Sequence, residues 1–363
     1  MSRPRPGITT GSTAGITAGI TRRRGLQAVA AIALALPLAA CGSDSSEDDS
    51  AADAGSSASS AAYSPVTIEH AFGSTTIEER PERVVTWGWG SSDAAIALGV
   101  IPVAIPKNSY GATEEGYMPW QKEALEAAGA DEPTLLTEGT EPPFEEIAAA
   151  APDVILANYS GITKADYTKL AQIAPTVAYP DQPWSTPWRD VITTVGQVLG
   201  KSDEAASLLD DIDAQVADAA AAHPEFEGLS IAAVAIDPSA FYVYTPADPR
   251  VQFLEDLGFT TAPSVTDLDT GEASFYYTLS PENVDQLTSD VLLSYVPSEE
   301  RVEEIASDPA FAGMQQIKDG TVASVVGESY VSAVSPPTAL SLTWGLDRFV
   351  EALAPAAAAA QKD

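Results

Sequence analysis

Cysteine and histidine are nearly absent from this chain of 363 residues. It contains one cysteine, Cys41, and two histidines, His70 and His223. A lone cysteine excludes an intrachain disulfide, so the fold must be stabilised by its hydrophobic core. Zinc and copper sites are usually built from clustered histidine and cysteine side chains, which this sequence does not supply. We therefore expect no cofactor and no directly bound metal; a metal that this protein handles would arrive inside its own chelator.

Basic residues are also scarce. The chain has 18 Lys+Arg against 52 Asp+Glu, a formal net charge of -34. A surface of this sign repels the phosphate backbone of nucleic acids and disfavours adsorption to anionic lipid headgroups. We expect no nucleic-acid partner, and the charge is typical of a protein that stays soluble outside the cell.

The first 40 residues have the features of an export signal. They contain no acidic residue, and Arg22, Arg23 and Arg24 precede an apolar run that ends at Ala40. This run is too short to span a bilayer as a helix. It ends in Leu-Ala-Ala directly before Cys41, which resembles a bacterial lipobox whose cysteine is lipidated. The alternative is a cleaved secretory peptide that leaves a free cysteine, and the paired arginines leave the export route open between the general and the twin-arginine systems.

Composition divides the rest of the chain into a tether and a folded part. Residues 41–62 are rich in Ser, Ala and Asp and contain no aliphatic side chain larger than alanine. Such a segment cannot bury a core, so we expect a disordered tether. We expect an N-terminal lobe over 63–184, a connecting helical segment over 185–223 and a C-terminal lobe over 224–363.

Strand and helix patterns alternate in the folded part. Arg83–Trp87 has the pattern of a buried strand, and the helical stretch that follows ends at Gly99. Alternation of this kind predicts α/β units with a parallel sheet. Two helical stretches, 188–199 and 202–222, are separated by Gly200. The predicted architecture is two Rossmann-like lobes joined by one long connecting α-helix, with a ligand cleft between the lobes.

A short pattern occurs once in each predicted lobe. In both places the pattern predicts a helix that opens with a proline and a glutamate in its first turn, Glu145 in one and Glu282 in the other. An aspartate stands eight residues after each glutamate, at Asp153 and Asp290, and precedes an apolar strand. This correspondence predicts a duplicated architecture.

Several short motifs in a fixed order carry a family resemblance over about residues 65–355. These motifs are Arg83-Val84-Val85 with Asp93 and Leu98-Gly99-Val100, Pro152-Asp153-Val154-Ile155, Leu170 to Thr176, Phe253-Leu254 with Leu257-Gly258-Phe259, and Ser280-Pro281-Glu282. With them the chain resembles the substrate-binding proteins of ABC importers, in the group that handles siderophores, haem and cobalamin.

The resemblance implies partners as well as a fold. It implies a monomer that delivers its ligand to an ABC permease and ATPase on the outer face of the cell membrane. In that family one acidic residue on each lobe contacts arginines of the permease, and the matching positions are Glu145 and Glu282. The alternative is that both acids only favour the dipole of the helix they begin.

Ligands of α/β lobes bind at the carboxyl ends of the strands. Aromatic side chains there offer a large, stiff surface with a polar tip, which suits a bulky chelate, although each one taken alone could equally belong to the core. Arg250, in a loop before a helix, could bind hydroxamate or carboxylate oxygens, or form a surface ion pair with Asp248 or Glu255. The candidate ligand-binding residues at predicted strand ends are Trp87, Trp89, Lys107, Tyr110, Tyr159, Trp184, Tyr242, Tyr244, Arg250 and Tyr276.

The scarcity of basic residues favours one class of ligand. A triply anionic tris-catecholate chelate would need several cations in the cleft, whereas a neutral or cationic hydroxamate chelate would not. We therefore expect a ferric hydroxamate siderophore, with cobalamin or haem as alternatives and an adhesion or sensor lipoprotein as a further one. An enzyme is not expected, because Asp93 replaces a glycine of the dinucleotide fingerprint and no Gly-x-Ser-x-Gly elbow of an α/β hydrolase is present.

Overall fold

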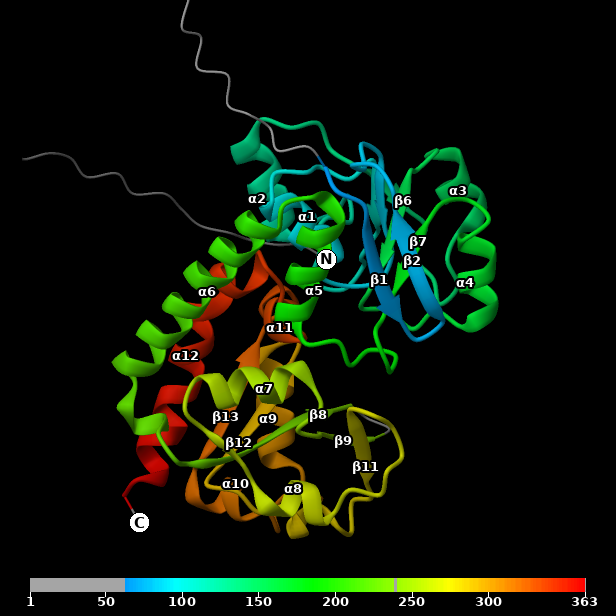
Figure 1. The fold of residues 1–363 in the computed structure, drawn as a ribbon. Helices are drawn as coiled ribbons and strands as arrows, with labels where there is room; N and C mark the ends of the chain where they lie inside the picture. The colour runs from blue at the N-terminus through cyan, green and yellow to red at the C-terminus, as the bar shows by residue number, and fades with distance from the viewer. Residues whose placement is uncertain (1–62, 238–239, 363) are drawn as a thin grey trace, which may run out of the picture. The chain divides into compact units, whose positions relative to one another are not determined.

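Two sheets, separated in sequence by a helical segment, organise the structure (Figure 1). This computed structural model describes residues 63–237 and 240–362. The expected signal peptide, the expected lipidation site Cys41 and the expected tether lie outside the described residues. The described chain begins with an antiparallel hairpin of β1 (Val66–His70) and β2 (Gly73–Ile77).

The first sheet is fully parallel, as the alternation of strands and helices predicts. Its strand order is β5-β4-β3-β6-β7. The strands are β3 (Val84–Thr86), β4 (Ala104–Pro106), β5 (Thr134–Leu136), β6 (Val154–Ala157) and β7 (Thr176–Ala178). The helices of this lobe are α1 (Ser91–Ala97), α2 (Pro119–Ala128), α3 (Phe144–Ala149) and α4 (Lys164–Leu170).

The order of these strands creates a switch point between β3 and β6. From β3 the chain proceeds outward to β4 and β5, and it then returns to β6 on the other side of β3. In an open parallel sheet the loops diverge at such a point and leave a crevice beyond the carboxyl ends of the two strands. The loops that leave β3 and β6 are therefore the expected place for a ligand.

The second sheet is mixed rather than parallel throughout. Its order is β11-β9-β8-β12-β13, with β10 paired to β8. Only residues 237–240 separate β8 from β9, and a connection this short joins antiparallel strands. The strands are β8 (Ser230–Ile236), β9 (Phe241–Tyr244), β10 (Thr260–Thr261), β11 (Tyr276–Leu279), β12 (Val291–Val296) and β13 (Val322–Val326).

Helices alternate with the strands of this second sheet, and α12 follows them. They are α7 (Pro249–Asp256), α8 (Pro263–Asp267), α9 (Glu299–Ser307), α10 (Gln315–Asp319), α11 (Glu328–Val334) and α12 (Ser341–Ala360), with short 3-10 helices η1 (Pro224–Phe226) and η2 (Val284–Gln286). Among the described residues, no helix combines the length and the apolar character that crossing a membrane requires.

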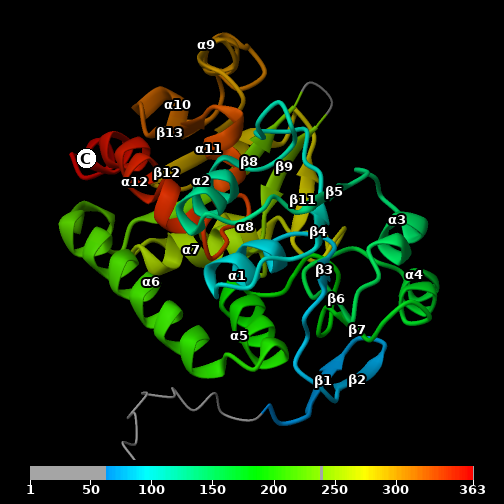
Figure 2. The ribbon, with the colours of Figure 1, turned by 90° about the horizontal axis from the view of Figure 1, so that it is seen from above.

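The connection between the sheets is a pair of helices, α5 (Trp188–Leu199) and α6 (Ser202–Ala222). Their bounds are the predicted ones, and the long helix of the connection is α6, with α5 preceding it as a separate helix. Gly200 ends α5 in the left-handed conformation, with φ of 64°. Helix α5 packs against α1 of the first lobe (Figure 2), whereas α6 lies alongside the C-terminal helix α12 (Figure 1).

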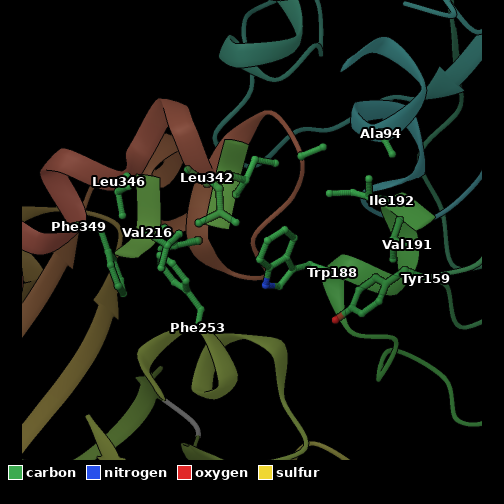
Figure 3. Close-up of a cluster of buried hydrophobic side chains, with 14 of the residues drawn as sticks. Ala94, Tyr159, Trp188, Val191, Ile192, Val216, Phe253, Leu342, Leu346 and Phe349 are labelled. Carbon is green, nitrogen blue, oxygen red and sulfur yellow. The ribbon is translucent and has the colours of Figure 1, made fainter. Parts of the chain in front are cut away.

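One hydrophobic cluster reaches across both lobes. It contains Ile192 of α5, Val216 of α6, Phe253 of α7 and Phe349 of α12, together with Ala94 of α1 (Figure 3). Phe253 and Phe349 stack with their ring centroids 5.2 Å apart. The helical connection is therefore part of the core, and the lobes are held together by buried apolar surface as well as by the chain.

Candidate ligand-binding site

The turns after β3 and β6 are pressed together at the switch point. The backbone N–H of Trp89 donates to the carbonyl of Tyr159 over 2.9 Å. Gly88, with φ of 98°, makes this approach possible, because a Cβ at this position would lie 2.3 Å from the carbonyl oxygen of Tyr159. The sequence-predicted residues Trp89 and Tyr159 are thus brought side by side by the topology of the sheet.

Trp89 also bridges the two lobes. Its indole Nε1–H donates to the carbonyl of Pro336, in the loop between α11 and α12, over 3.0 Å. Trp89, Tyr159 and Trp188 line a narrow crevice with Pro249 and Thr338 of the second lobe. In Figure 3 the ring of Tyr159 lies beside Val191 of α5, with its hydroxyl pointing away from that helix.

A buried ion pair lies on the second-lobe side. Asp248 is the N-cap of α7, and its carboxylate accepts the backbone N–H of Arg250 over 2.8 Å. The same carboxylate accepts Nε–H of Arg250 over 2.6 Å and Nη2–H over 2.7 Å. Asp248 was one of two predicted surface partners of Arg250. The two residues do pair, but the pair is buried, because the Asp248 carboxylate has no exposed surface. The other suggested partner, Glu255, accepts a hydrogen bond from Thr261 instead.

The guanidinium of Arg250 stays charged in this setting. Burial by itself lowers its pKa, but the Asp248 carboxylate and the neighbouring Tyr244 outweigh that effect and the pKa is raised. The guanidinium lies over the ring of Tyr244, 3.8 Å from its centroid. Its Nη1–H donates to the hydroxyl of Ser335 over 2.9 Å.

Three tyrosines from three elements surround this ion pair. Tyr159 follows β6, Tyr244 ends β9 and Tyr295 lies in β12. Burial raises the pKa of all three phenols; the Arg250 guanidinium opposes this shift and the Asp248 carboxylate adds to it, and the pKa of each stays raised. The hydroxyls therefore stay protonated and are available as hydrogen-bond donors.

Tyr295 is not among the ligand-binding residues predicted from the sequence. Its ring packs edge-to-face on Tyr244 with 6.0 Å between centroids, and its buried hydroxyl has no hydrogen-bond partner among the described residues. The apolar run that contains it has the pattern of a fully buried strand, so Tyr295 resembles any core residue. The only available signal was a tyrosine, which carries a polar tip, within such a run.

Two aromatic side chains stand out at the edge of this cluster. Tyr110 is 44% exposed and Trp184 is 39% exposed, and these are the exposed large hydrophobic side chains of the part of the chain that the structure describes. The carbonyl of Tyr110 accepts the hydroxyl of Ser332, in α11, over 3.4 Å, so this part of the first lobe reaches the second. Trp184 packs edge-to-face on Tyr159 with 5.7 Å between centroids.

The other predicted ligand-binding residues lie in the core, in an exposed loop and at the edge of the second sheet. Trp87 is buried in the core of the first lobe and lies with the packing residues rather than with the cluster. Lys107 is exposed after β4, with its side chain over Gly116. Tyr242 and Tyr276 form a ring pair with 5.5 Å between centroids, and Tyr276 lies opposite Tyr244 in the β9–β11 ladder. This pair extends the aromatic surface along the edge of the second sheet.

Both glutamates of the short repeat are exposed, but their local structures differ. Glu145 lies in the first turn of α3, as predicted. Glu282 does not lie in an α-helix, contrary to the prediction, because it sits in a turn before the 3-10 helix η2. The backbone N–H of Asn283 closes this turn onto the carbonyl of Ser280, and the helical hydrogen bonds continue for only three residues.

The cluster as a whole can hold a bulky ligand with an oxygen-rich centre. Its interior offers phenol and guanidinium donors, and its edge offers aromatic faces. Within the described ranges, no three His, Cys, Asp or Glu side chains are grouped so that they could hold a metal ion.

Comparison with known proteins gives consistent matches. The sequence model of the family described as "Periplasmic binding protein" matches residues 84–325. The ferric enterobactin-binding periplasmic protein FepB of Escherichia coli is 29% identical over 223 residues, which is 59% of this chain and 67% of FepB. The probable siderophore-binding lipoprotein YfiY of Bacillus subtilis is 30% identical over 153 residues, 42% of this chain and less than half of YfiY, at 44%.

Among solved structures, PiaA of Streptococcus pneumoniae in complex with ferrichrome superposes with a TM-score of 0.75. It is 33% identical, and the match covers 81% of this chain and 99% of that one. These similar proteins are named as binding proteins.

Proposed function

We propose, from the premise that this chain belongs to the periplasmic binding protein family, that it captures a ferric siderophore outside the cytoplasm and delivers it to an ABC importer. The observation that carries the proposal is the pair of exposed aromatic side chains, Tyr110 and Trp184, beside a buried cluster contributed by both lobes. Exposed aromatic faces beside a cluster of buried hydrogen-bond donors are typical of ligand sites, because a ring offers a large, stiff apolar surface. Here they would contact the apolar rim of a chelate.

The charge of the cluster supports a hydroxamate siderophore. The guanidinium of Arg250 is offset by Asp248, so the pair adds no net charge to the site. A neutral ferric tris-hydroxamate would meet protonated phenols and unshared N–H groups at no electrostatic cost. Iron would enter as a preformed chelate, with all of its coordination positions filled by the siderophore.

The tyrosines argue against haem as the ligand. Haem binding through tyrosine uses the phenolate as axial ligand. Burial raises the pKa of Tyr159, Tyr244 and Tyr295, which opposes formation of a phenolate. The same groups in protonated form are well suited to donate hydrogen bonds to hydroxamate oxygens.

Delivery would use the outer surfaces of the two lobes. Glu145 and Glu282 are both exposed, one on each lobe, and could pair with arginines of a permease. A lipid on Cys41 would keep the protein at the membrane. We propose this anchor from the sequence of the signal segment alone.

Titration of tryptophan fluorescence would test the ligand class. The panel contains ferrichrome, a ferrioxamine, a ferric tris-catecholate, cobalamin and haemin. We expect saturable quenching by the hydroxamates and weaker or no response to cobalamin and haemin. Saturable binding of cobalamin or haemin, with none of any ferric chelate, would overturn the proposal.

Calorimetry of two variants would test the position of the site. Trp184→Ala and Tyr110→Ala should each weaken ferric hydroxamate binding about tenfold, because a rigid aromatic contact is lost. Gln215→Ala, on the exposed surface of α6, is the control and should bind as the wild type does. Unchanged affinity in the Trp184/Tyr110 double variant would place the ligand elsewhere.

A further inference from the structure

The buried carboxylate of Asp248 is committed entirely to one neighbour. Both of its oxygens are occupied by Arg250, one by Nε–H and the backbone N–H and the other by Nη2–H. With no exposed surface, Asp248 cannot itself touch a ligand in the cleft. Any influence that it has on a ligand must therefore act through the guanidinium.

Arg250 keeps hydrogen-bonding capacity after this pairing. A guanidinium has five N–H donors. Two of them point to Asp248 and one donates to Ser335. Two N–H groups, one on each Nη atom, have no acceptor among the described residues, and the side chain keeps 10% of its surface exposed. The guanidinium lies over the ring of Tyr244. Arg250 can thus still donate two hydrogen bonds, although its positive charge is offset by the Asp248 carboxylate.

Among the described residues, the groups that act on the Arg250 guanidinium include no second cation. Tyr159, Tyr244 and Tyr295 contribute neutral phenols around the pair. Glu328, at the start of α11, lies beside Tyr110 and adds an acid to the same side of the cleft. Its carboxylate also accepts the backbone N–H of Gly111 over 3.4 Å.

We propose that Asp248 sets the charge specificity of the cleft. By cancelling Arg250 it lets the site accept a neutral or cationic ferric chelate and denies an anionic one the attraction of a free guanidinium. Asp248 is then a positioning and specificity residue that never contacts the ligand. This inference rests on the proposed function, because it concerns the ligand of that same site.

The experiment compares two ligands in four proteins. The ligands are ferrichrome, which is neutral, and a ferric tris-catecholate, which carries three negative charges. The proteins are the wild type, Asp248→Asn, Arg250→Gln and the double variant. Dissociation constants are measured by calorimetry at low and at high NaCl, and the result is the ratio of the two constants in each protein.

A charge role predicts opposite shifts in the two single variants. Asp248→Asn leaves the guanidinium unopposed, so preference for the tris-catecholate should rise at least about tenfold at low salt. Arg250→Gln leaves the carboxylate unopposed, so the preference should fall. The double variant is neutral again, and its ratio should return to within about threefold of the wild type. Added salt should shrink each shift, because it screens the ligand's charge.

A purely structural role predicts a different pattern. Loss of packing around Tyr244 would weaken the binding of both ligands by the same factor, so the ratio of their dissociation constants would be unchanged in every variant. That result overturns the inference even if ferric chelates bind. If Asp248→Asn does not fold, the same test is made by comparing the ratio of the two dissociation constants in Arg250→Gln with the ratio in the double variant. Equal ratios in these two proteins would overturn the inference.

The proposed function is tested separately by the wild type alone. If the wild type binds neither ferric chelate, the proposed function fails. If it binds one of them and the ratios do not move, only the role of Asp248 fails.

Discussion

Trp184 is held in a backbone conformation that bulky residues rarely adopt. Its φ is 57°, in the left-handed region, and its backbone N–H donates to the carbonyl of Ser160. Strain of this kind persists only where the surroundings impose it, and it is often found where a side chain must be presented to a ligand. Here it presents the indole over Gly161, which leaves room for it.

Substitution of Gly161 should disturb the site without unfolding the protein. A Cβ at Gly161 would lie 2.4 Å from the indole Nε1 of Trp184, so Gly161→Ala must displace the ring. We expect binding of a ferric hydroxamate to weaken about fivefold to tenfold, as for loss of part of an aromatic contact. The control is Gly139→Ala, where the nearest atom to an added Cβ is 3.5 Å away. Equal calorimetric affinities in the two variants would contradict this role of Gly161.

The environment of His70 makes the stability of the folded protein depend on pH. Nδ1 of His70 accepts the backbone N–H of Phe72 over 3.2 Å. Nε2 lies 2.9 Å from the hydroxyl of Thr75, which itself donates to the carbonyl of Thr176. The ring is thus arranged as a neutral imidazole with its proton on Nε2. Burial lowers the pKa of His70, and the positive charge of Lys164 lowers it further, against the smaller opposing effect of Glu69.

The sign of the resulting pH dependence follows from linkage. The unfolded chain takes up a proton on this ring at a higher pH than the folded protein does, so stability is lost as the pH falls below about 6.5. Urea unfolding between about pH 7.5 and 5.5 should show this decline. His70→Gln cannot titrate and should flatten the curve in that window. A variant with the wild-type slope would show that other groups cause the decline.

The sequence was sufficient to predict most of the clustered aromatic residues but not the burial of Trp87 and Asp248. Trp89, Tyr110, Tyr159, Tyr244 and Arg250 could be selected because they lie near the ends of predicted strands, and Trp184 because it lies at the approach to the connecting helix. Contacts in the structure link Trp184 to Tyr159 and Arg250 to Tyr244. Trp87 could not be separated from them, because the two tryptophans are only two positions apart and the orientation of the turn decides which one faces the core. The burial of Asp248 depends on packing against the other lobe, which no local pattern encodes.

At the scale of elements, a buried acid ties helices of the first lobe to the second. Asp93 of α1 accepts hydrogen bonds from the indole of Trp120 over 2.7 Å and the amide of Gln121 over 2.6 Å, both in α2. It also accepts the hydroxyl of Thr338, in the loop before α12. One carboxylate thus fixes three elements, and burial raises its pKa even though each of these donors opposes that shift.

Removal of this carboxylate should destabilise the fold. Asp93→Ala would leave three buried donors without an acceptor, so we expect a loss of about 2–4 kcal/mol in the free energy of unfolding. Asp218→Ala, in an exposed position on α6, should change it by less than about 0.5 kcal/mol. Urea denaturation of both variants makes the comparison. A similar loss in both would mean that Asp93 does not hold these elements together.

Elements were predicted well where their pattern was long and strongly periodic. Helices α5 and α6 have the bounds that the spacing of apolar residues indicated, and the parallel first sheet follows from alternation. The antiparallel pairing of β9 with the edge strand β11 was not predicted, because the two strands are more than thirty residues apart in the sequence. Glu282 was misplaced because a proline and an acid suit a turn as well as a helical start.

At the scale of the whole molecule, the separation of Glu145 and Glu282 allows binding and delivery to be distinguished. Both are exposed on different lobes and neither belongs to the aromatic cluster. In the double variant Glu145→Lys/Glu282→Lys, ferric hydroxamate binding should stay within about twofold of the wild type. Iron uptake by cells that depend on this protein should fall at least about tenfold, because two charge contacts become repulsive.

A charge-matched control separates docking from net charge. Glu303 on α9 and Asp218 on α6 are both exposed, and Glu303→Lys/Asp218→Lys, which changes the net charge by the same amount, should leave uptake unchanged. Normal uptake with the Glu145/Glu282 double variant would show that these two acids serve only their own local structure. An equal fall in the Glu303/Asp218 double variant would point to the overall acidity of the surface.

The apolar cluster shared by α5, α6, α7 and α12 has a practical consequence for dissection of the protein. A fragment cut after α5 would present Ile192 and Val195 to water, and the complementary fragment would expose Phe349 and its neighbours. Neither half would be soluble and native when expressed alone. Swapping a lobe with that of a relative would therefore require transplanting the matching faces of these helices as well, or the chimaera would aggregate.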